Sequence, residues 1–201
     1  MPTYLTRSFY RRDVVKVARE LLGHLLVHVN GRQRVSGLIV ETEAYLGIPD
    51  KAAHTCNGRR TARNESMWRD GGHTYVYFTY GMHHCVNVVA GVEDEPVAVL
   101  LRALEPVDGM QAMYRRRPAA KCDTDLCSGP AKLAKALQID RQLDRIDLVK
   151  SKRVFIERIR ATPLQSQQVA TGPRIGIAHA AEWTHKPLRF WLKNSTYISH
   201  K

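Results

Sequence analysis

Two turn signals constrain the fold of this chain more than any other feature of its sequence. Asn30-Gly31 separates two segments of strand-forming residues, and such a dipeptide supplies the positive φ angles that a type I′ hairpin turn requires. Gly81-Met82 separates two further segments, which are rich in aromatic and β-branched residues. The four flanking segments are 24–29, 34–45, 74–80 and 83–90. We therefore expect two antiparallel hairpins.

Helical signals are few and do not alternate with the strands. Asp13 can cap a helix over 14–22, whose apolar residues recur at helical spacing. Further helices are expected at 106–117 and at 130–137, and the latter is opened by Ser128-Gly129-Pro130, in which Ser128 provides the cap and Pro130 the early proline. Strands are also expected at 97–104, 154–157, 174–178 and 188–192, and a long loop at 47–72. Because βαβ units are lacking, we expect an α+β fold, a single domain over residues 1–201 with a curved antiparallel β-sheet, flanking helices and a protruding β-hairpin.

The charge balance indicates a polyanionic partner. The chain has 31 Lys and Arg against 19 Asp and Glu, a formal net charge of +12, which favours nucleic acid. No window holds the ~18 consecutive apolar residues of a membrane span, and the first ten residues lack an apolar signal core. We expect a cytoplasmic protein, and a monomer is the simplest interpretation. The four cysteines include no Cys-x-x-Cys pair and are interpreted as reduced thiols.

Two carboxylates share one face of the second expected strand. Alternation places four residues on one side, namely Ile39, Glu41, Glu43 and Tyr45. Carboxylates two positions apart lie roughly 6.5 to 7 Å apart along a strand, so each raises the pKa of the other unless a cation lies between them. One of them could then act as a general base. A solvated face is the commoner fate of alternating Glu and Thr, but the strand leads into the long loop that holds His54.

The second hairpin carries aromatic rings on both faces. Aromatic strand residues are usually buried, so Phe78 and Tyr75 are assigned to the core. Tyr80 and Met82 lie at the turn, where a ring and a thioether would protrude. Unstacking a base step in DNA costs a few kcal/mol, and a protruding apolar tip on a basic protein suits a wedge that fills the resulting gap.

Basic residues are densest in two parts of the sequence. The first cluster lies in the long loop, at Arg59, Arg60 and Arg63; the second follows the central helix, at Arg115, Arg116, Arg117 and Lys121. The helix start from Ser128 to Lys132 could add an anion site. Each residue alone could be solvated, but together they could follow one phosphate backbone.

No metal site and no cofactor are expected. The chain contains His54, His73, His83 and His84, but no motif fixes three ligands at a known spacing. Pro2 could become an N-terminal secondary amine after removal of Met1, yet its neighbours do not support a nucleophile there, so we interpret it as an ordinary N-terminal residue.

Motifs of several residues follow one another along nearly the whole chain. In order they are Val40-Glu41-Thr42-Glu43-Ala44-Tyr45-Leu46-Gly47, Ala52-Ala53-His54, Arg63-Asn64, Tyr75-Val76-Tyr77, Tyr80-Gly81-Met82 with Asn87, Leu100-Leu101-Arg102-Ala103-Leu104-Glu105-Pro106, Leu126-Cys127-Ser128-Gly129-Pro130 and Lys186-Pro187-Leu188-Arg189-Phe190. Together they resemble the alkyladenine (3-methyladenine, or N-methylpurine) DNA glycosylase family. Several motifs in this order are far more specific than any single Glu or Tyr.

The resemblance implies an enzyme that flips a damaged purine out of double-stranded DNA and hydrolyses its N-glycosidic bond, leaving an abasic site. Glu43 matches the general base that deprotonates the attacking water, and Arg102 matches the arginine that helps to hold the carboxylate and the water. Glu41 is then structural. The implied lesions are alkylated or deaminated purines, namely 3-methyladenine, 7-methylguanine, hypoxanthine and ethenoadenine.

The resemblance also implies how the base and the DNA are held. The implied base pocket comprises Tyr45, His54, Tyr77, Asn87, Ala53, Met67 and Leu100. Within it, Asn87 crowds the amino group of normal guanine. Tyr80 and Met82 are the implied intercalating residues, and the implied DNA-backbone contacts are Arg59, Arg63, Arg115, Ser128 and Lys132. His83 and His84 stand where better-known relatives carry aromatic residues, which we expect to change the pocket depth and the lesion range.

Two other function classes stay open on the residues alone. A non-catalytic nucleic-acid-binding protein needs only basic charge and exposed aromatic residues, but it leaves Glu43 beside Tyr45 unexplained. A metal-dependent hydrolase would use the histidines, and activity that resists EDTA would eliminate it.

Overall fold

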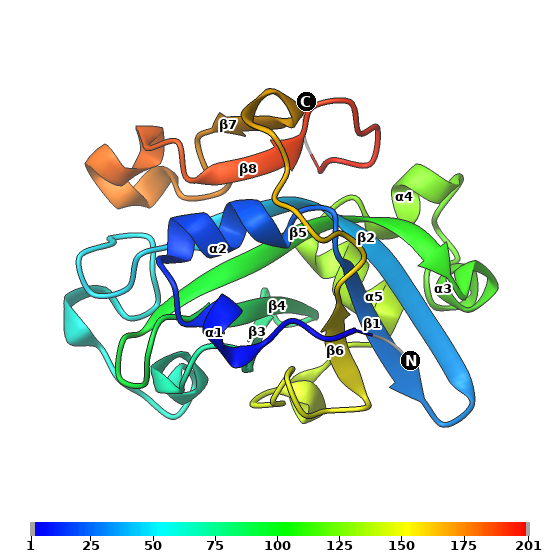
Figure 1. The fold of residues 1–201 in the computed structure, drawn as a ribbon, viewed down its shortest axis with the longest axis horizontal. Helices are drawn as coiled ribbons and strands as arrows, with labels where there is room; N and C mark the ends of the chain where they lie inside the picture. Colours follow the sequence, from blue (N-terminus) through cyan, green and yellow to red (C-terminus); the bar gives the residue numbers. More distant parts are fainter. Residues whose placement is uncertain (1–2, 200–201) are drawn as a thin grey trace.

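The protein is built around one antiparallel β-sheet of eight strands (Figure 1). The structure is a computed structural model and describes residues 3–199. Pro2 therefore lies outside the described residues. The strands are β1 (Leu25–Asn30), β2 (Gln33–Tyr45), β3 (Thr74–Thr79), β4 (His83–Ala90), β5 (Val97–Asp108), β6 (Val154–Glu157), β7 (Val169–Gly172) and β8 (Arg189–Leu192). Their order is β3-β4-β5-β2-β1-β6, while β8 pairs with both β2 and β7. The expected α+β fold with an antiparallel sheet is confirmed.

Short helices flank the sheet, and α2 lies across β2 and β5 in Figure 1. Asp13 caps α2 as expected, because its carboxylate accepts a hydrogen bond of 2.9 Å from the backbone N–H of Lys16. The α-helices are α1 (Arg7–Tyr10), α2 (Val14–Leu21), α3 (Met110–Arg116), α4 (Asp123–Cys127) and α5 (Pro130–Leu137). The 3-10 helices are η1 (Cys56–Gly58), η2 (Glu65–Trp68), η3 (Arg141–Leu143), η4 (Ser166–Gln168) and η5 (Ala178–His185).

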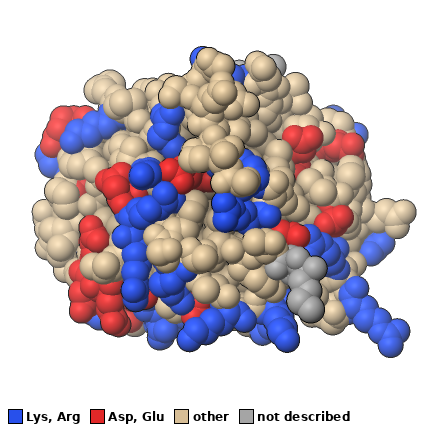
Figure 2. All heavy atoms as spheres, viewed as in Figure 1, with Lys and Arg blue, Asp and Glu red and all other residues tan. Residues whose placement is uncertain are grey.

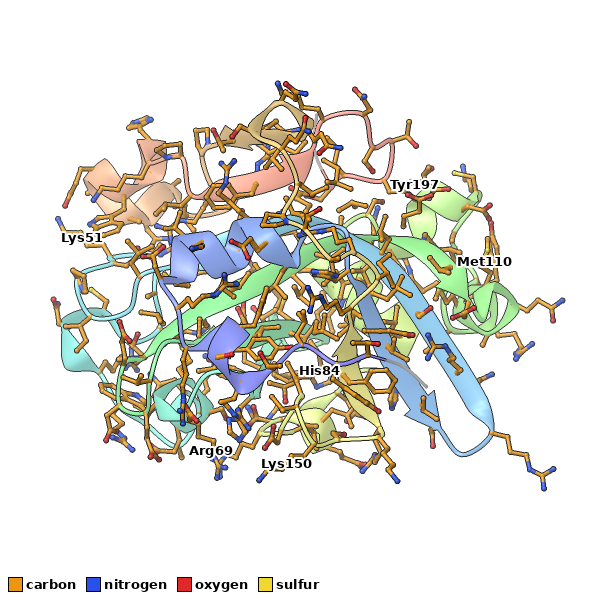
Figure 3. All side chains as sticks on the ribbon, viewed as in Figure 1. Lys51, Arg69, His84, Met110, Lys150 and Tyr197 are labelled. Atoms are coloured by element: carbon orange, nitrogen blue, oxygen red, sulfur yellow. The ribbon has the colours of Figure 1, made fainter. Side chains whose placement is uncertain are left out.

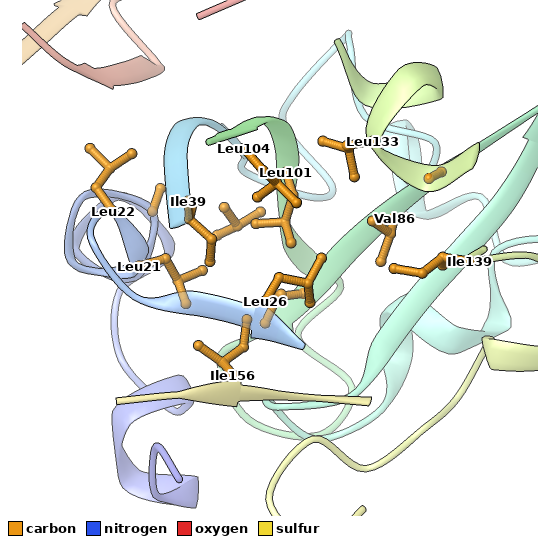
Figure 4. Close-up of a cluster of buried hydrophobic side chains, with 14 of the residues drawn as sticks. Leu21, Leu22, Leu26, Ile39, Val86, Leu101, Leu104, Leu133, Ile139 and Ile156 are labelled. Carbon is orange, nitrogen blue, oxygen red and sulfur yellow. The ribbon is translucent and has the colours of Figure 1, made fainter. Parts of the chain in front are cut away.

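The main hydrophobic core lies between the sheet and its helices (Figure 4). It joins apolar side chains of α2, β1, β2, β4, β5, α5 and β6. Figure 4 labels Leu21, Leu22, Leu26, Ile39, Val86, Leu101, Leu104, Leu133, Ile139 and Ile156. Burying this apolar area provides the main driving force for folding and gives the polar residues on the other face of the sheet a rigid support.

Two register shifts between β2 and β5 determine which side chains lie on the face of the sheet opposite the main core. Ile39 pairs with Leu104, but Glu41 pairs with Ala103 and Thr42 with Leu101, so Val40 and Arg102 each fall out of the regular ladder. Ile39 belongs to the main core, unlike Glu41. The expectation that Ile39 shares a face with Glu41 is therefore wrong, because a bulge reverses the alternation after it.

Two expected elements differ from the structure for local reasons. The helix expected at 106–117 begins only at Met110, because β5 continues through Asp108 and Gly109 then takes a left-handed φ of 75°. The segment 174–178 is not a strand. Its Arg174 is buried in an ion pair with Asp50, and β7 ends before it.

Two expected side-chain placements are also wrong. Phe78 is 44% exposed rather than in the core, whereas Tyr75 is buried as expected. Ser128 does not cap α5, whose N-cap residue is Gly129 followed by Pro130. All four cysteines are free thiols, in agreement with the sequence-based interpretation.

Candidate active site

The middle of β2 places two glutamates in the interior of the sheet. The first half of this strand pairs with β1, but its second half pairs with β8, while β5 runs along its other edge. Glu41 and Glu43 are both completely buried as a result. A solvated strand face is thus excluded, and each carboxylate needs compensating partners.

Arg102 lies between the two carboxylates, as a cation that reduces their mutual repulsion. Its Nε is 3.3 Å from Glu41 Oε1, and its Nη1 is 3.2 Å from Glu43 Oε1. Arg102 is the residue that falls out of the β5 ladder, and it is only 6% exposed. The irregularity therefore directs the guanidinium at both acids.

Glu41 is engaged on every side. Its Oε1 accepts hydrogen bonds from Arg189 Nη1 at 3.1 Å and from Ser199 Oγ at 2.9 Å, and its Oε2 accepts one from the Ser199 backbone N–H at 2.6 Å. Ser199 Oγ also lies 3.1 Å from Arg102 Nη2. Glu41 thus joins the C-terminal segment to β2 and orients Arg102.

Glu43 keeps more accepting capacity than Glu41. Its Oε1 accepts from the Ile175 backbone N–H at 2.8 Å, and its Oε2 accepts from the Tyr45 hydroxyl at 3.0 Å. With Arg102, these described partners fill three of the roughly four lone-pair directions of a carboxylate. Burial raises the pKa of Glu43 above its ordinary value; Arg102, the Ile175 N–H and the Tyr45 hydroxyl oppose this shift. A raised pKa makes the ionised carboxylate a stronger base.

A cavity of about 370 Å³ is lined by Tyr45, Arg102 and Ile175, the three residues that contact Glu43. Glu43 itself lies behind them and is not part of the lining. The chain segments that line the cavity come from the end of β2 and its loop, from β3, β4 and β5, and from the segment before η5. Its lining includes Tyr45, Ala52, His54, Met67, Tyr75, Tyr77, Asn87, Leu100, Arg102, Ile175 and Ile177. A space of this size, lined by several aromatic rings together with the polar side chains of Asn87 and Arg102, suits a small planar ligand.

Three rings form one side of the cavity. His54 meets Tyr77 edge to face with centroids 4.7 Å apart, and Tyr75 stacks on Tyr77 at 5.4 Å. Nδ1 of His54 shares a hydrogen bond of 2.7 Å with the Tyr75 hydroxyl. Desolvation, together with Arg63 and Arg59, lowers the pKa of His54 to about 4. The imidazole is therefore neutral at physiological pH.

The structure brings most of the expected pocket residues together. Tyr45, His54, Tyr77, Asn87, Met67 and Leu100 all line the cavity. Asn87 is buried, and its Nδ2 donates to the Tyr75 carbonyl oxygen at 3.1 Å, which fixes the amide in the wall. Ala53 is the exception. It lines a neighbouring hollow instead, and Ala52 takes its place, because the turn after Asp50 directs Ala53 away from the cavity.

The β3–β4 hairpin protrudes at the mouth of the cavity. Tyr80 is 86% exposed and Met82 70% exposed, and Tyr80 also borders the cavity. Tyr80 has a left-handed φ of 50°, a conformation that costs a non-glycine residue energy and that gives the turn its fixed shape. An exposed ring held in this way is available to a partner.

The expected DNA-backbone residues do not form one cluster. Arg59 and Arg63 border the hollow next to His54, and Arg63 donates to the Phe78 carbonyl oxygen at 3.1 Å. Arg115 lies in α3, at the opposite end of the long axis from the loop that contains Lys51 (Figure 3). One DNA strand could contact both the loop with Arg59 and Arg63 and the helix α3 only if it ran across the whole molecule.

The remaining basic residues have mostly local partners. Lys132 Nζ lies 3.3 Å from Ser128 Oγ at the start of α5. Arg60 is paired with Glu65 and Asp94, and Arg116 and Arg117 donate to backbone carbonyls. On the face shown in Figure 2, basic side chains line much of the lower edge, and acidic side chains lie among them at the left and right. Of the expected clusters, Arg59 and Arg63 are the basic residues nearest to the cavity.

Sequence reasoning missed the segment from Arg174 to His179. Ile175, Gly176, Ile177 and His179 line the cavity, and the Ile175 N–H contacts Glu43. The segment was interpreted as a strand because its apolar residues alternate. Gly176 within the segment, and Gly172-Pro173 directly before it, were the available signal for an irregular path.

Two features are absent from the part of the chain that the structure describes. Within residues 3–199, no group of three or more His, Cys, Asp or Glu side chains is arranged to hold a metal ion. Over the same residues, no helix has the length and apolar character needed to cross a membrane.

Comparison with known proteins agrees with this geometry. The family model described as methylpurine-DNA glycosylase (MPG) matches residues 8–196 of the chain. The chain belongs to the methylpurine-DNA glycosylase family. It is thus a DNA-3-methyladenine glycosylase, a monofunctional hydrolase of DNA repair whose substrate is damaged DNA.

Relatives that cover nearly the whole chain support this assignment to the methylpurine-DNA glycosylase family. A candidate 3-methyladenine DNA glycosylase of Desulfitobacterium hafniense is 45% identical over 204 residues, covering 98% of each protein. The DNA-3-methyladenine glycosylase of Homo sapiens is 41% identical over 207 residues, which cover 98% of this chain and 68% of the human protein. The enzyme of Mus musculus is 43% identical over 205 residues, which cover 96% of this chain and 60% of the mouse protein.

We expect Arg102→Met to lower the free energy of unfolding by about 3–5 kcal/mol at about pH 7.5, because it leaves buried carboxylates without their shared cation. The substitution also raises the pKa of Glu43 further, since Arg102 lowers it most. A carboxyl group whose pKa is higher in the folded protein favours folding at low pH and disfavours it as the pH rises through that pKa. The loss of unfolding free energy in Arg102→Met, relative to the wild type, should therefore be smaller at about pH 5.5 than at about pH 7.5. Urea unfolding at the two pH values measures it.

Arg59→Met, at an exposed position, serves as the control and should change stability by less than about 0.5 kcal/mol. An equal deficit for Arg102→Met at both pH values would contradict the electrostatic account.

Proposed function

We propose that this enzyme extrudes an alkylated or deaminated purine from duplex DNA into the cavity and hydrolyses its N-glycosidic bond with a water activated by Glu43. The proposed lesions are 3-methyladenine, 7-methylguanine, hypoxanthine and ethenoadenine. The product is an abasic site in an intact strand. The observation that carries the proposal is the completely buried Glu43, which keeps a free lone-pair direction beside a cavity walled by aromatic rings.

In this proposal Glu43 deprotonates the water and Arg102 orients it. The carboxylate of Glu43 accepts a proton from the water while the oxygen attacks the anomeric carbon of the sugar. The bond between that carbon and the purine nitrogen breaks, and its electron pair leaves with the base. Arg102 touches both Glu43 and the cavity, so it can orient the water and stabilise the ionised carboxylate.

The rings of the cavity suit a cationic base. Purines methylated at N3 or N7 carry a positive charge, which aromatic faces attract. A neutral His54 adds no repulsion, and its pKa is lowered by partial desolvation and by Arg63 and Arg59, although part of the residue is exposed. Tyr45 and Tyr77 are then the rings that hold the base, and Asn87 is placed in the wall where it would crowd an exocyclic amino group.

Extrusion needs a group that replaces the departed base. Tyr80 provides an exposed ring at the tip of a hairpin that borders the cavity, and Met82 adds an exposed thioether two residues later. Arg63 and Arg59, beside the same opening, are the proposed phosphate contacts on the loop side. Because Tyr80 borders the cavity, the wedge and the base pocket can act on the same nucleotide.

Glu43→Gln tests the chemical role directly. We expect a fall in the single-turnover rate of base release by about 10²–10⁴-fold, because the amide cannot accept the proton of the water. Binding to duplex DNA that contains ethenoadenine should change little, since the amide keeps the size of the side chain. The measurements are quenched-flow release of free base in the presence of EDTA and a fluorescence titration of the same duplex.

The wild-type protein is the reference for both measurements. Base release that persists in Glu43→Gln would exclude Glu43 as the base. Binding without any base release by the wild type would favour the alternative, a non-catalytic nucleic-acid-binding protein, and loss of release in EDTA would favour a metal-dependent hydrolase.

The pH dependence of the single-turnover rate should follow the ionisation of Glu43. With a 7-methylguanine substrate the leaving group is already cationic, so no acid is needed to protonate it. We expect the single-turnover rate to fall as the pH is lowered through the pKa of Glu43, with a midpoint above the ordinary value of 4.5. Spontaneous depurination is measured in parallel with Glu43→Gln and subtracted. A rate independent of pH down to that ordinary value would refute this assignment.

Tyr80→Ala should weaken binding to damaged duplex by about 1–3 kcal/mol, because the ring can no longer stack in the vacated space. The same change should slow extrusion, which is measured from the fluorescence of ethenoadenine after rapid mixing. Ile159→Ala is the matched control, since Ile159 is also exposed but does not border the cavity. Equal affinity and extrusion rate for both variants would remove the wedge role.

A further inference from the structure

A buried ion pair behind the cavity wall has no part in the chemistry described so far. Arg174 and Asp50 are both completely buried, and two guanidinium nitrogens of Arg174 contact the two carboxylate oxygens of Asp50 at 2.5 and 2.8 Å. The two residues are 124 positions apart in the chain. The pair therefore joins the loop after β2 to the segment after β7.

Each member of this pair holds a different part of the site. Arg174 Nη1 donates to the Ala44 carbonyl oxygen at 3.0 Å, and its guanidinium lies 4.6 Å from the centre of the Tyr45 ring. Asp50 accepts from the backbone N–H groups of Leu46 at 2.9 Å and Ala52 at 3.0 Å. The pair thus fixes one side of the Tyr45 ring and the loop that leads to the other ring residues.

The neighbours of Arg174 are the two uncharged donors that Glu43 uses. The Tyr45 hydroxyl donates to one carboxylate oxygen, and the N–H of Ile175, the residue directly after Arg174, donates to the other. Moving Arg174 therefore moves both donors together.

Stability alone does not account for such a pair. Removing two charges from water costs several kcal/mol per ion, and well-packed apolar residues often stabilise a protein as much as a buried ion pair does. What a guanidinium adds is geometry, because its planar fork can hold a carboxylate, a carbonyl oxygen and an aromatic face at fixed angles. A flexible ammonium group cannot satisfy all three.

We propose that Arg174, held by Asp50, is a positioning residue for base release: it sets the two uncharged donors against Glu43 and so fixes the orientation and proton affinity of that carboxylate. The inference rests on the proposed role of Glu43 as the base. Arg174 itself does not line the cavity.

The test is Arg174→Lys, studied with 7-methylguanine duplex DNA under single-turnover conditions across the acid range. We expect a rate at neutral pH about 10–100-fold lower than that of the wild type, since small displacements of a catalytic group have effects of this size. We also expect the acid limb to move to higher pH. Both donors lower the pKa of Glu43, so weakening them raises it. Affinity for the duplex should stay within about threefold.

Two variants accompany this test. Arg160→Lys is the matched control, because Arg160 is a partly buried arginine that donates to the carbonyl oxygens of Glu20 and Leu22, away from the cavity, and its acid limb should coincide with that of the wild type. Asp50→Asn keeps the size of the carboxylate while removing its charge, and it should reproduce the direction of the Arg174→Lys shift. It replaces Arg174→Lys if that variant does not fold.

The outcomes separate the inference from the function on which it rests. An unchanged acid limb in Arg174→Lys and Asp50→Asn, with or without a loss of thermal stability, would reduce the pair to a structural role and overturn the inference. Base release that survives in Glu43→Gln would instead overturn the proposed function. A shifted acid limb in Arg174→Lys, with none in Arg160→Lys, supports the inference.

Discussion

The burial of two carboxylates on one strand is the constraint on which the rest of this structure depends. Glu41 and Glu43 lie where β2 is paired on both edges, so neither can reach bulk water. A buried charge without partners is very costly, and the fold meets this demand with Arg102, Arg189 and several hydrogen-bond donors. The partners are unequal. Glu41 accepts from partners on both of its oxygens and holds the C-terminal segment, whereas Glu43 retains one unused lone-pair direction, and this difference is what our proposal for Glu43 uses.

The cavity is assembled from segments that are far apart in the sequence. Rings from β2, β3 and the loop after β2 face one cavity, while the hairpin tip beside it carries an exposed ring on a strained backbone. The core on the opposite face of the sheet makes this arrangement rigid, since α2 and the apolar side chains of α5 pack there, while Pro130 at the start of α5 lines the cavity. Stability and recognition are thereby placed on separate faces of the same strands.

Much of this architecture could be predicted from sequence, for identifiable reasons. Asn30-Gly31 and Gly81-Met82 mark their turns locally, so both hairpins and the protruding tip were predictable. The expected type I′ geometry at Asn30-Gly31 is wrong, because Asn30 pairs with Gln33 and, of the two central residues, Gly31 has a positive φ and Arg32 does not. The site residues came from a resemblance in motif order, which carried Tyr45, His54 and Tyr77 to one cavity. The bulge at Val40 left no sequence signal, because an apolar residue suits either face, and Ile39 was misplaced for that reason. Arg174 could not be placed at all. Its partner lies 124 residues away, and no local pattern encodes such a pair.

The pairing of β2 with β8 has a consequence for the order in which the enzyme is made. The partners that neutralise Glu41 include Arg189 and Ser199, which are 148 and 158 residues further along the chain. Contacts of such sequence separation form late, since long loops must close before they contribute. A nascent chain on the ribosome therefore carries the acid pair in water, with neither the proton affinity nor the rigidity that catalysis requires. If Glu43 is the base, as we propose, the buried acid pair is completed only after the last strand has been added, because Glu41 and Arg102 are held by residues in that strand or after it.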